Sequence, residues 1–221
     1  MNNGLIEYLS EFITDNRFYR FNEIIEYRTR YITIVLEDIF QPHNASAVLR
    51  SCECFGIQDV HIIENNNKYN VNPDVALGSN KWLNLIKYNE TKNNSVSAIK
   101  QIKNEGYRIV ATTPHKNNVN LDDFDIEKGK IAIFFGAELN GLSDEALNHS
   151  DEFLSIPMFG FTESLNISVS VAIIIKTLIL KLHRSNIPWK LTKNEKMELK
   201  LQWLKNSIKN SDLLIKNFKG K

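Results

Sequence analysis

Short apolar runs alternate with segments of helical periodicity over most of the chain. The runs predict five buried strands, at 32–36, 60–63, 107–111, 131–135 and 153–156. Apolar residues at helical spacing predict the intervening helices, at 44–55, 95–104, 143–147 and from 164 or 166 to 184. This alternation predicts an α/β fold with a mostly parallel sheet flanked by helices. Because such sheets bind ligands beyond the carboxyl ends of their strands, we expect any site in the loops that follow them.

Both ends of the chain carry helical patterns that stand outside this alternation. Residues 4–30 show helical spacing in two pieces, and a last amphipathic helix is predicted over 192–217 after a break at Ile187 and Pro188. The expected organisation is therefore a helical extension over 1–30, an α/β domain over 31–186 and a second helical extension over 187–221.

The composition excludes a disordered, fibrous or membrane-embedded chain. The 221 residues are 43% hydrophobic and 24% charged, a balance that allows a core without disulfides or metal. The longest apolar stretch, 169–180, is too short and too polar to cross a bilayer. The first residues lack a signal-peptide pattern, and Cys52 and Cys54 would point to different faces of a helix. We expect a cytoplasmic protein with reduced thiols and no membrane partner.

Charge is distributed unevenly along the chain. The formal net charge is only +1, but residues 187–221 carry nine lysines against three acidic residues. A basic segment on a near-neutral body is typical of a polyanion partner. A lysine-rich, solvated helix face explains the same composition equally well.

Several common motifs are missing from the sequence. No G-x-G-x-x-G follows the first predicted strand, and Leu142 and Ser143 stand where a phosphate-binding loop would need Lys and Ser or Thr. The five histidines do not have the spacing of a zinc site, and there is no G-x-S-x-G. The sequence predicts no bound metal ion.

Three segments that follow predicted strands carry residues that a generic sheet does not need. In the first, Asn44 can cap a helix, and Arg50 lies among small apolar residues, where a guanidinium needs an anionic partner. In the second, Gly136 and Gly141 flank Glu138, and two glycines let the backbone approach a ligand closely. Taken singly, these segments also fit a surface arginine and an ordinary turn.

The third segment lies between the last predicted strand and the long apolar helix. It passes through Pro157 and Gly160 to a polar helix start at Ser164 or Asn166. The first turn of a helix offers free N–H groups, so this segment could also face a ligand.

Together the three segments resemble the signature motifs of the SPOUT (SpoU/TrmH-type) 2′-O-ribose RNA methyltransferases, in order and spacing, over roughly 30–184. Pro42-His43-Asn44, the stretch from Ala76 to Trp82, and Ala111-Thr112 resemble the branch that methylates the D-loop guanosine of tRNA. The short segment before the first strand is too small for the N-terminal RNA-binding domain that rRNA-modifying relatives usually carry.

The resemblance implies a C-terminal deep trefoil knot, a homodimer with each active site at the subunit interface, and S-adenosylmethionine as cofactor. Knots are rare among folds, and this family is one of the exceptions. The implied cofactor loops match 112–114, 136–141 and 156–166. The cofactor-binding residues implied within them are Thr112, Gly136, Glu138, Ile156, Met158 and Leu165.

The implied activity is S-adenosylmethionine-dependent 2′-O-methylation of a ribose in tRNA, with the D-loop guanosine as the expected target. The implied catalytic residues are Arg50, Asn44, Ser164, Asn166 and Glu138. Arg50 could act as the base or could bind the neighbouring phosphate, and its high pKa makes the first role awkward. Both roles stay open at this point.

Basic residues in the terminal extensions are the expected contacts to RNA phosphates. They are Arg17, Arg20, Arg28, Arg30, Lys190, Lys193 and Lys196. Three alternatives remain: the same chemistry on rRNA or another tRNA position, a non-catalytic RNA-binding knot protein, and a nucleotide-binding protein of flavodoxin type. The last gives the third segment no role.

Overall fold

The computed structural model describes residues 2–113 and 118–219. The chain divides into two compact units. Arg30–Trp189 forms an α/β unit, and the described parts of Met1–Thr29 and Lys190–Lys221 together form a helical terminal unit. No helix in the described residues is both long enough and apolar enough to cross a membrane.

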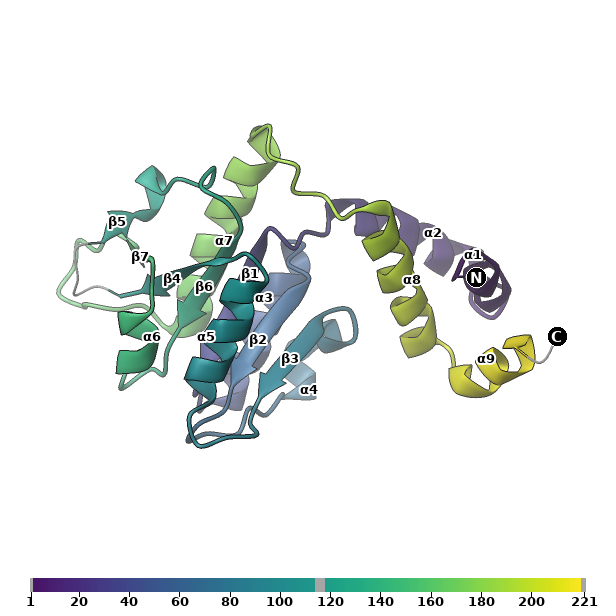
Figure 1. Ribbon diagram of the computed structural model, residues 1–221, viewed down its shortest axis with the longest axis horizontal. Coiled ribbons are helices and arrows are strands. Elements are labelled where there is room, and N and C mark those ends of the chain that lie inside the picture. The colour runs from purple at the N-terminus through teal and green to yellow at the C-terminus, as the bar shows by residue number, and fades with distance from the viewer. Residues whose placement is uncertain (1, 114–117, 220–221) are drawn as a thin grey trace. The chain divides into compact units, whose positions relative to one another are not determined.

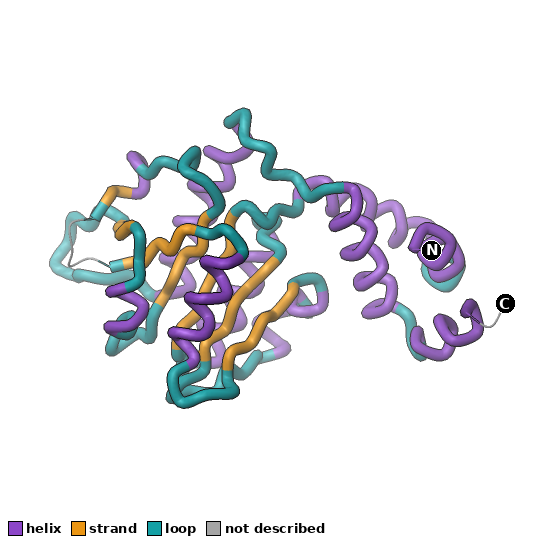
Figure 2. Tube along the Cα trace, in the orientation of Figure 1, coloured by secondary structure: helices purple, strands orange, loops and turns teal. Residues whose placement is uncertain are grey.

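The α/β unit is built on one parallel sheet. Its strands are β1 Ile32–Glu37, β2 Asp59–Ile63, β3 Asn84–Tyr88, β4 Arg108–Thr112, β5 Val119–Asn120, β6 Ile131–Phe135 and β7 Glu152–Ser155. Within the described residues their order is β3-β2-β1-β6-β4-β7-β5, and every neighbouring pair is parallel (Figures 1 and 2). The chain therefore places β6 between β1 and β4, which both precede it.

Helices cover both faces of the sheet. They are α3 Pro42–Cys54, α4 Pro73–Ala76, α5 Asn94–Asn104, α6 Asp144–Asn148 and α7 Ile167–Arg184. Ile34 and Leu36 of β1 pack in one core with residues of α3 and α7, whereas Val35 packs in the other with residues of α5 and α6. In Figure 1, α5 lies in front of the sheet and α3 and α7 lie behind it. Burial on both sides explains why the inner strands are continuously apolar.

The five predicted strands are confirmed, and two more were missed. β3 and β5 form the two edges of the sheet. β3 is mostly half-buried and β5 is exposed, so neither carries the apolar run that reveals an inner strand. A short apolar strand is predictable where both faces are covered and much less so at an edge.

Two predictions about helix ends are wrong. Asn44 does not cap α3, because the helix begins at Pro42, whose fixed φ suits the first turn, and Asn44 lies inside that turn. The predicted helix over 192–217 is two helices, α8 Lys193–Ser207 and α9 Ser211–Lys219. The chain turns between them at Asn210, whose φ of 60° ends a helical path.

The terminal unit joins the two ends of the chain. It contains α1 Asn2–Ser10, α2 Asp15–Ile24 and the short 3-10 helix Ile25–Tyr27, together with α8 and α9. Trp203 of α8 is buried and meets the Phe21 ring edge-on at 5.5 Å between centroids. A β-bridge between Thr29 and Lys190 holds the two chain segments together.

Acid should destabilise the α/β unit through His61. The ring is buried, its Nδ1 lies 2.9 Å from the Tyr88 hydroxyl, and burial lowers the pKa of His61 to about 4. The unfolded chain, with a histidine pKa near ~6.5, takes up this proton first. The free energy of unfolding should therefore fall by about 2–3 kcal/mol between pH 7 and 4.5 through this group. Denaturant titrations at both pH values should show a smaller loss for His61→Gln; equal losses would contradict the assignment.

Candidate functional site

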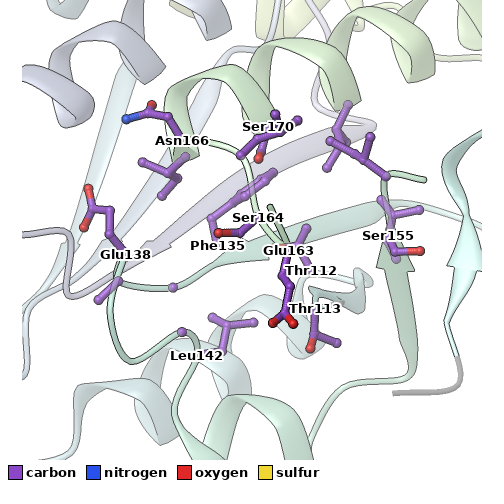
Figure 3. A pocket seen from close by; sticks show the side chains of 18 of the residues that line it. Thr112, Thr113, Phe135, Glu138, Leu142, Ser155, Glu163, Ser164, Asn166 and Ser170 are labelled. Atoms are coloured by element: carbon purple, nitrogen blue, oxygen red, sulfur yellow. The ribbon is translucent and has the colours of Figure 1, made fainter. Parts of the chain in front are cut away.

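A cavity of about 660 Å³ lies at the carboxyl ends of β6, β4 and β7 (Figure 3). These strands are neighbours in the sheet. Its walls come from Thr112 and Thr113, from 135–142, from 154–156 with Met158, and from 163–167 with the first turns of α7. The volume falls within the roughly 300–1,000 Å³ typical of small-molecule sites. The prediction that the site lies beyond the strand ends agrees with this position.

The loop after β6 is folded tightly on itself. The Ala137 N–H donates to the Gly141 carbonyl at 3.1 Å, and the Gly141 N–H donates to the Ala137 carbonyl at 2.9 Å. A Cβ on Gly136 would lie 2.1 Å from the Gly141 carbonyl carbon, so only glycine fits there. Gly141 has a φ of 66°, which favours glycine. The two glycines thus keep backbone, rather than side chains, against the cavity.

The exit of this loop is attached to the end of β1. The Ser143 N–H and hydroxyl donate to the Glu37 carboxylate at 2.8 and 2.7 Å, and the Ser95 hydroxyl also donates to it. Glu37 is buried. Glu37 was not predicted as a site residue; its only signal in the sequence is an acidic residue at the end of an apolar strand.

A chain of hydrogen bonds joins the three segments that stood out in the sequence. Asn44 Nδ2 donates to Glu138 Oε1 at 2.6 Å, and Asn166 Nδ2 donates to Asn44 Oδ1 at 3.1 Å. Asn166 Oδ1 then accepts the Ser168 N–H at 2.9 Å and caps α7. Glu138 and Asn166 lie near each other at one edge of the cavity (Figure 3).

The direction of this chain follows from Glu138. An ionised carboxylate only accepts hydrogen bonds, so Asn44 must turn its amide nitrogen toward Glu138. Its oxygen then faces Asn166, whose nitrogen must donate and whose oxygen is left for the helix start. At the other end, the Ser168 N–H can only donate, so the start of α7 requires the same orientation of Asn166. Gln41 Oε1 also accepts from Asn44 Nδ2, at 3.2 Å. The acceptors at one end and the donor at the other therefore require the same orientation of the two amide groups.

The structure brings all of the predicted cofactor-binding residues to the cavity wall. They are Thr112, Gly136, Glu138, Ile156, Met158 and Leu165. Ser164 also lines the cavity, and the Thr112 hydroxyl donates to the Phe134 carbonyl at 2.8 Å. Pro114, at the end of the first implied cofactor loop, lies outside the described residues.

Arg50 stands apart from this cluster. It lies on α3 beyond Asn44, is exposed, and is not part of the cavity wall. Among the described residues, no hydrogen bond or ion pair holds its guanidinium. Its charge is therefore available to an external anion.

The basic residues of the terminal extensions have different environments. Arg17, Arg20, Lys190 and Lys193 are exposed. Lys196 lies 2.6 Å from the Glu26 carboxylate, and this hydrogen bond holds the pKa of Glu26 below its ordinary value. Arg30 belongs to the α/β unit, where its Nε lies 3.0 Å from Asp59 Oδ2.

Arg28 corrects the predicted RNA contacts. It is only 1% exposed, and its guanidinium lies over the Trp203 ring at 5.3 Å from the centroid. A side chain that is buried in the core of the terminal unit cannot reach an RNA phosphate, so the prediction for Arg28 is wrong.

No group of His, Cys, Asp or Glu in the described part of the chain has an arrangement that could hold a metal ion.

Comparisons with known proteins agree with the resemblance of the motifs. Residues 31–176 match the SpoU rRNA Methylase family. A tRNA (guanosine(18)-2'-O)-methyltransferase of Borreliella burgdorferi is 48% identical over 202 residues, which cover 91% of this chain and 90% of that protein.

Two solved structures have the same fold. The A. aeolicus TrmH/SpoU tRNA modifying enzyme superimposes with a TM-score of 0.77 at 28% identity, over 88% of this chain and 98% of that one. The SpoU methyltransferase AviRb from Streptomyces viridochromogenes, solved in complex with the cofactor AdoMet, superimposes with a TM-score of 0.57 over 74% of this chain and 62% of that one. At 17% identity the second likeness concerns the fold alone.

Gly136→Ala should disrupt the loop after β6. The new Cβ would overlap the Gly141 backbone, which is held by two hydrogen bonds and cannot yield cheaply. We expect the free energy of unfolding to fall by about 3 kcal/mol in denaturant titrations. Gly160→Ala is the matched control, since its nearest neighbour, the Thr162 nitrogen, would be 4.0 Å from the Cβ. Equal stability of the two variants would contradict the close approach at Gly136.

Proposed function

The chain belongs to the SpoU methylase family, and we propose that it transfers a methyl group from S-adenosylmethionine to the ribose 2′-oxygen of guanosine 18, in the D-loop of tRNA. The observation that carries the proposal is the hydrogen-bonded meeting of Asn44, Glu138 and Asn166 at the edge of one cavity. The 48% identity to a tRNA (guanosine(18)-2'-O)-methyltransferase over most of both chains supports this substrate.

The cavity fits S-adenosylmethionine in size and chemistry. Apolar side chains of Ile156, Met158 and Leu165 suit an adenine ring, and the loop from Gly136 to Gly141 offers backbone groups at close range. Glu138 and Thr112 supply the polar contacts, with the carboxylate suited to a positively charged group. When bound, S-adenosylmethionine supplies an electrophilic methyl group attached to a positively charged sulfur.

The residues of the chain then have to orient a weak nucleophile, since a neutral ribose hydroxyl needs a base or strong polarisation. We assign Arg50 to the phosphate beside the target ribose, because a guanidinium binds phosphate with two parallel bonds and does not give up its proton readily. Asn44, Ser164 and Asn166 position the ribose, and Glu138 and the Ser168 N–H hold the two amides in one orientation from opposite ends. Most of the rate gain would come from positioning.

The proposal includes a deep trefoil knot and a homodimer. The insertion of β6 between two earlier strands and the packing of α7 against α3 support a threaded C-terminal segment. Val169, Ile173 and Leu180 form an apolar stripe on α7 that is 44%, 36% and 39% exposed. A second subunit that covers this stripe could also bring Arg50 to the cavity of its partner.

Exposed basic residues of the terminal unit are the proposed contacts to tRNA phosphates: Arg17, Arg20, Lys190 and Lys193. Such contacts give salt-sensitive affinity and position the RNA without reading its bases. Contacts from Arg30 and Lys196 would compete with their carboxylate partners. A cytoplasmic location and metal-free activity stay predictions of the sequence.

An assay on unmodified tRNA transcripts tests the function. With S-adenosylmethionine, nuclease digestion should release 2′-O-methylguanosine, and a transcript with 2′-deoxyguanosine at position 18 should give none. Arg50→Ala should reduce turnover by at least about 10³-fold while S-adenosylmethionine affinity stays within about twofold, since the loss falls on transition-state positioning. Arg50→Lys should restore little, because an ammonium lacks the two-pronged geometry.

Two results would count against this assignment. Methylation of another tRNA position, or of an rRNA transcript in preference, would favour the same chemistry on a different substrate. Near-normal turnover of Arg50→Ala at saturating tRNA and cofactor would remove Arg50 from the catalytic residues.

Sedimentation tests the dimer. The chain should sediment at about twice its 25.5 kDa, because burial of the α7 stripe favours association. Ile173→Glu should yield monomers that have lost methyl transfer, since a carboxylate cannot be buried there without a partner. Val96→Glu, which alters another exposed apolar residue on α5, is the control and should remain dimeric. A fully active monomer would exclude a shared site.

A further inference from the structure

We propose that Glu37 is a positioning residue for cofactor binding: through Ser143 it holds the loop 136–142 in the shape that forms the cavity wall. The inference rests on the proposed function, because it takes the ligand of that cavity to be S-adenosylmethionine. Neither the motifs nor the family match singled out Glu37, which lies at the end of β1 and outside the cavity wall.

Both ends of the loop are attached to the last two residues of β1. At the entry, Phe135 pairs in register with Leu36 in the sheet. At the exit, Ser143 donates its N–H and its hydroxyl to the Glu37 carboxylate at 2.8 and 2.7 Å. The loop is closed on itself by the Ala137–Gly141 pair, and its two ends are attached to one strand, the entry through the sheet and the exit through Glu37.

The carboxylate gives this attachment its strength. Glu37 is 2% exposed, so water contributes little to its solvation. Its described donors are the two groups of Ser143 and the Ser95 hydroxyl, all of them neutral. A buried carboxylate is costly without donors, so any displacement of Ser143 would leave the charge poorly solvated. The position of the loop exit is thus coupled to the solvation of a buried charge.

The competing explanation is that Glu37 only stabilises the fold. A variant of Ser95 distinguishes this explanation from a role in cofactor binding. Ser95 lies in the first turn of α5 and donates to the same carboxylate from outside the loop. Loss of its hydroxyl removes one hydrogen bond from Glu37, and Ser143→Ala does the same. Ser143→Ala also removes the side-chain cap of α6 at the Ala146 N–H, a contact that Glu37→Gln leaves in place. Only Ser143, however, adjoins the cavity wall, at Leu142.

Calorimetric titration of the full-length chain with S-adenosylmethionine is the test. Ser143→Ala should weaken binding about tenfold, Ser143→Thr should restore it to within about twofold, and Ser95→Ala should lower the melting temperature with binding unchanged. The double variant Glu37→Gln with Ser143→Ala should bind no more weakly than Glu37→Gln alone, since both changes break one connection.

Other results would overturn either the role of Glu37 or the proposed function. Normal binding by Ser143→Ala, equal weakening by Ser95→Ala, or additive effects in the double variant would overturn the role of Glu37. Failure of the unmodified chain to bind S-adenosylmethionine would overturn the proposed function, and this assignment with it. If Glu37→Gln does not fold, the two serine variants and Ser143→Thr decide the question on their own.

Discussion

One chain of side-chain hydrogen bonds connects the three segments of the site. Glu138 accepts from the amide of Asn44 at one end, and the Ser168 N–H donates to the amide of Asn166 at the other, so the two amides have one shared orientation. The three residues are 94 and 122 positions apart along the chain, so local geometry could not align them. These hydrogen bonds therefore join the loop after β6 to the first turn of α3 and to the start of α7.

The parallel sheet makes that meeting possible. In parallel strands all carboxyl ends lie at the same edge, so the loops after β4, β6 and β7 converge wherever those strands are adjacent. The sequence was sufficient to predict the inner strands, because burial on two faces leaves continuous apolar runs at β1 and β6. The order of the strands could not be predicted, because the placement of β6 between β1 and β4 depends on packing that no local pattern encodes.

Some residues of the site could be predicted from the sequence and others could not. Glu138 and Asn166 could be found because polar residues and glycines after a strand are unusual in a generic sheet. Glu37 was missed because an acid that ends an apolar run looks like the exit of a strand into water, and only the tertiary fold supplies its serine donors. Arg28 was assigned to RNA because charge predicts exposure, while the ring that covers it comes from Trp203, far along the chain.

The terminal unit has a consequence for the order of folding. Its core combines Phe21 from the start of the chain with Trp203 from near the end, and Thr29 bridges to Lys190. During synthesis at about 5–20 residues per second, the first helices wait roughly 10–40 s for the last. Throughout that interval Phe21 of α2 lacks the Trp203 ring that packs against it. The segment made first is thus completed only after α8 has been synthesised.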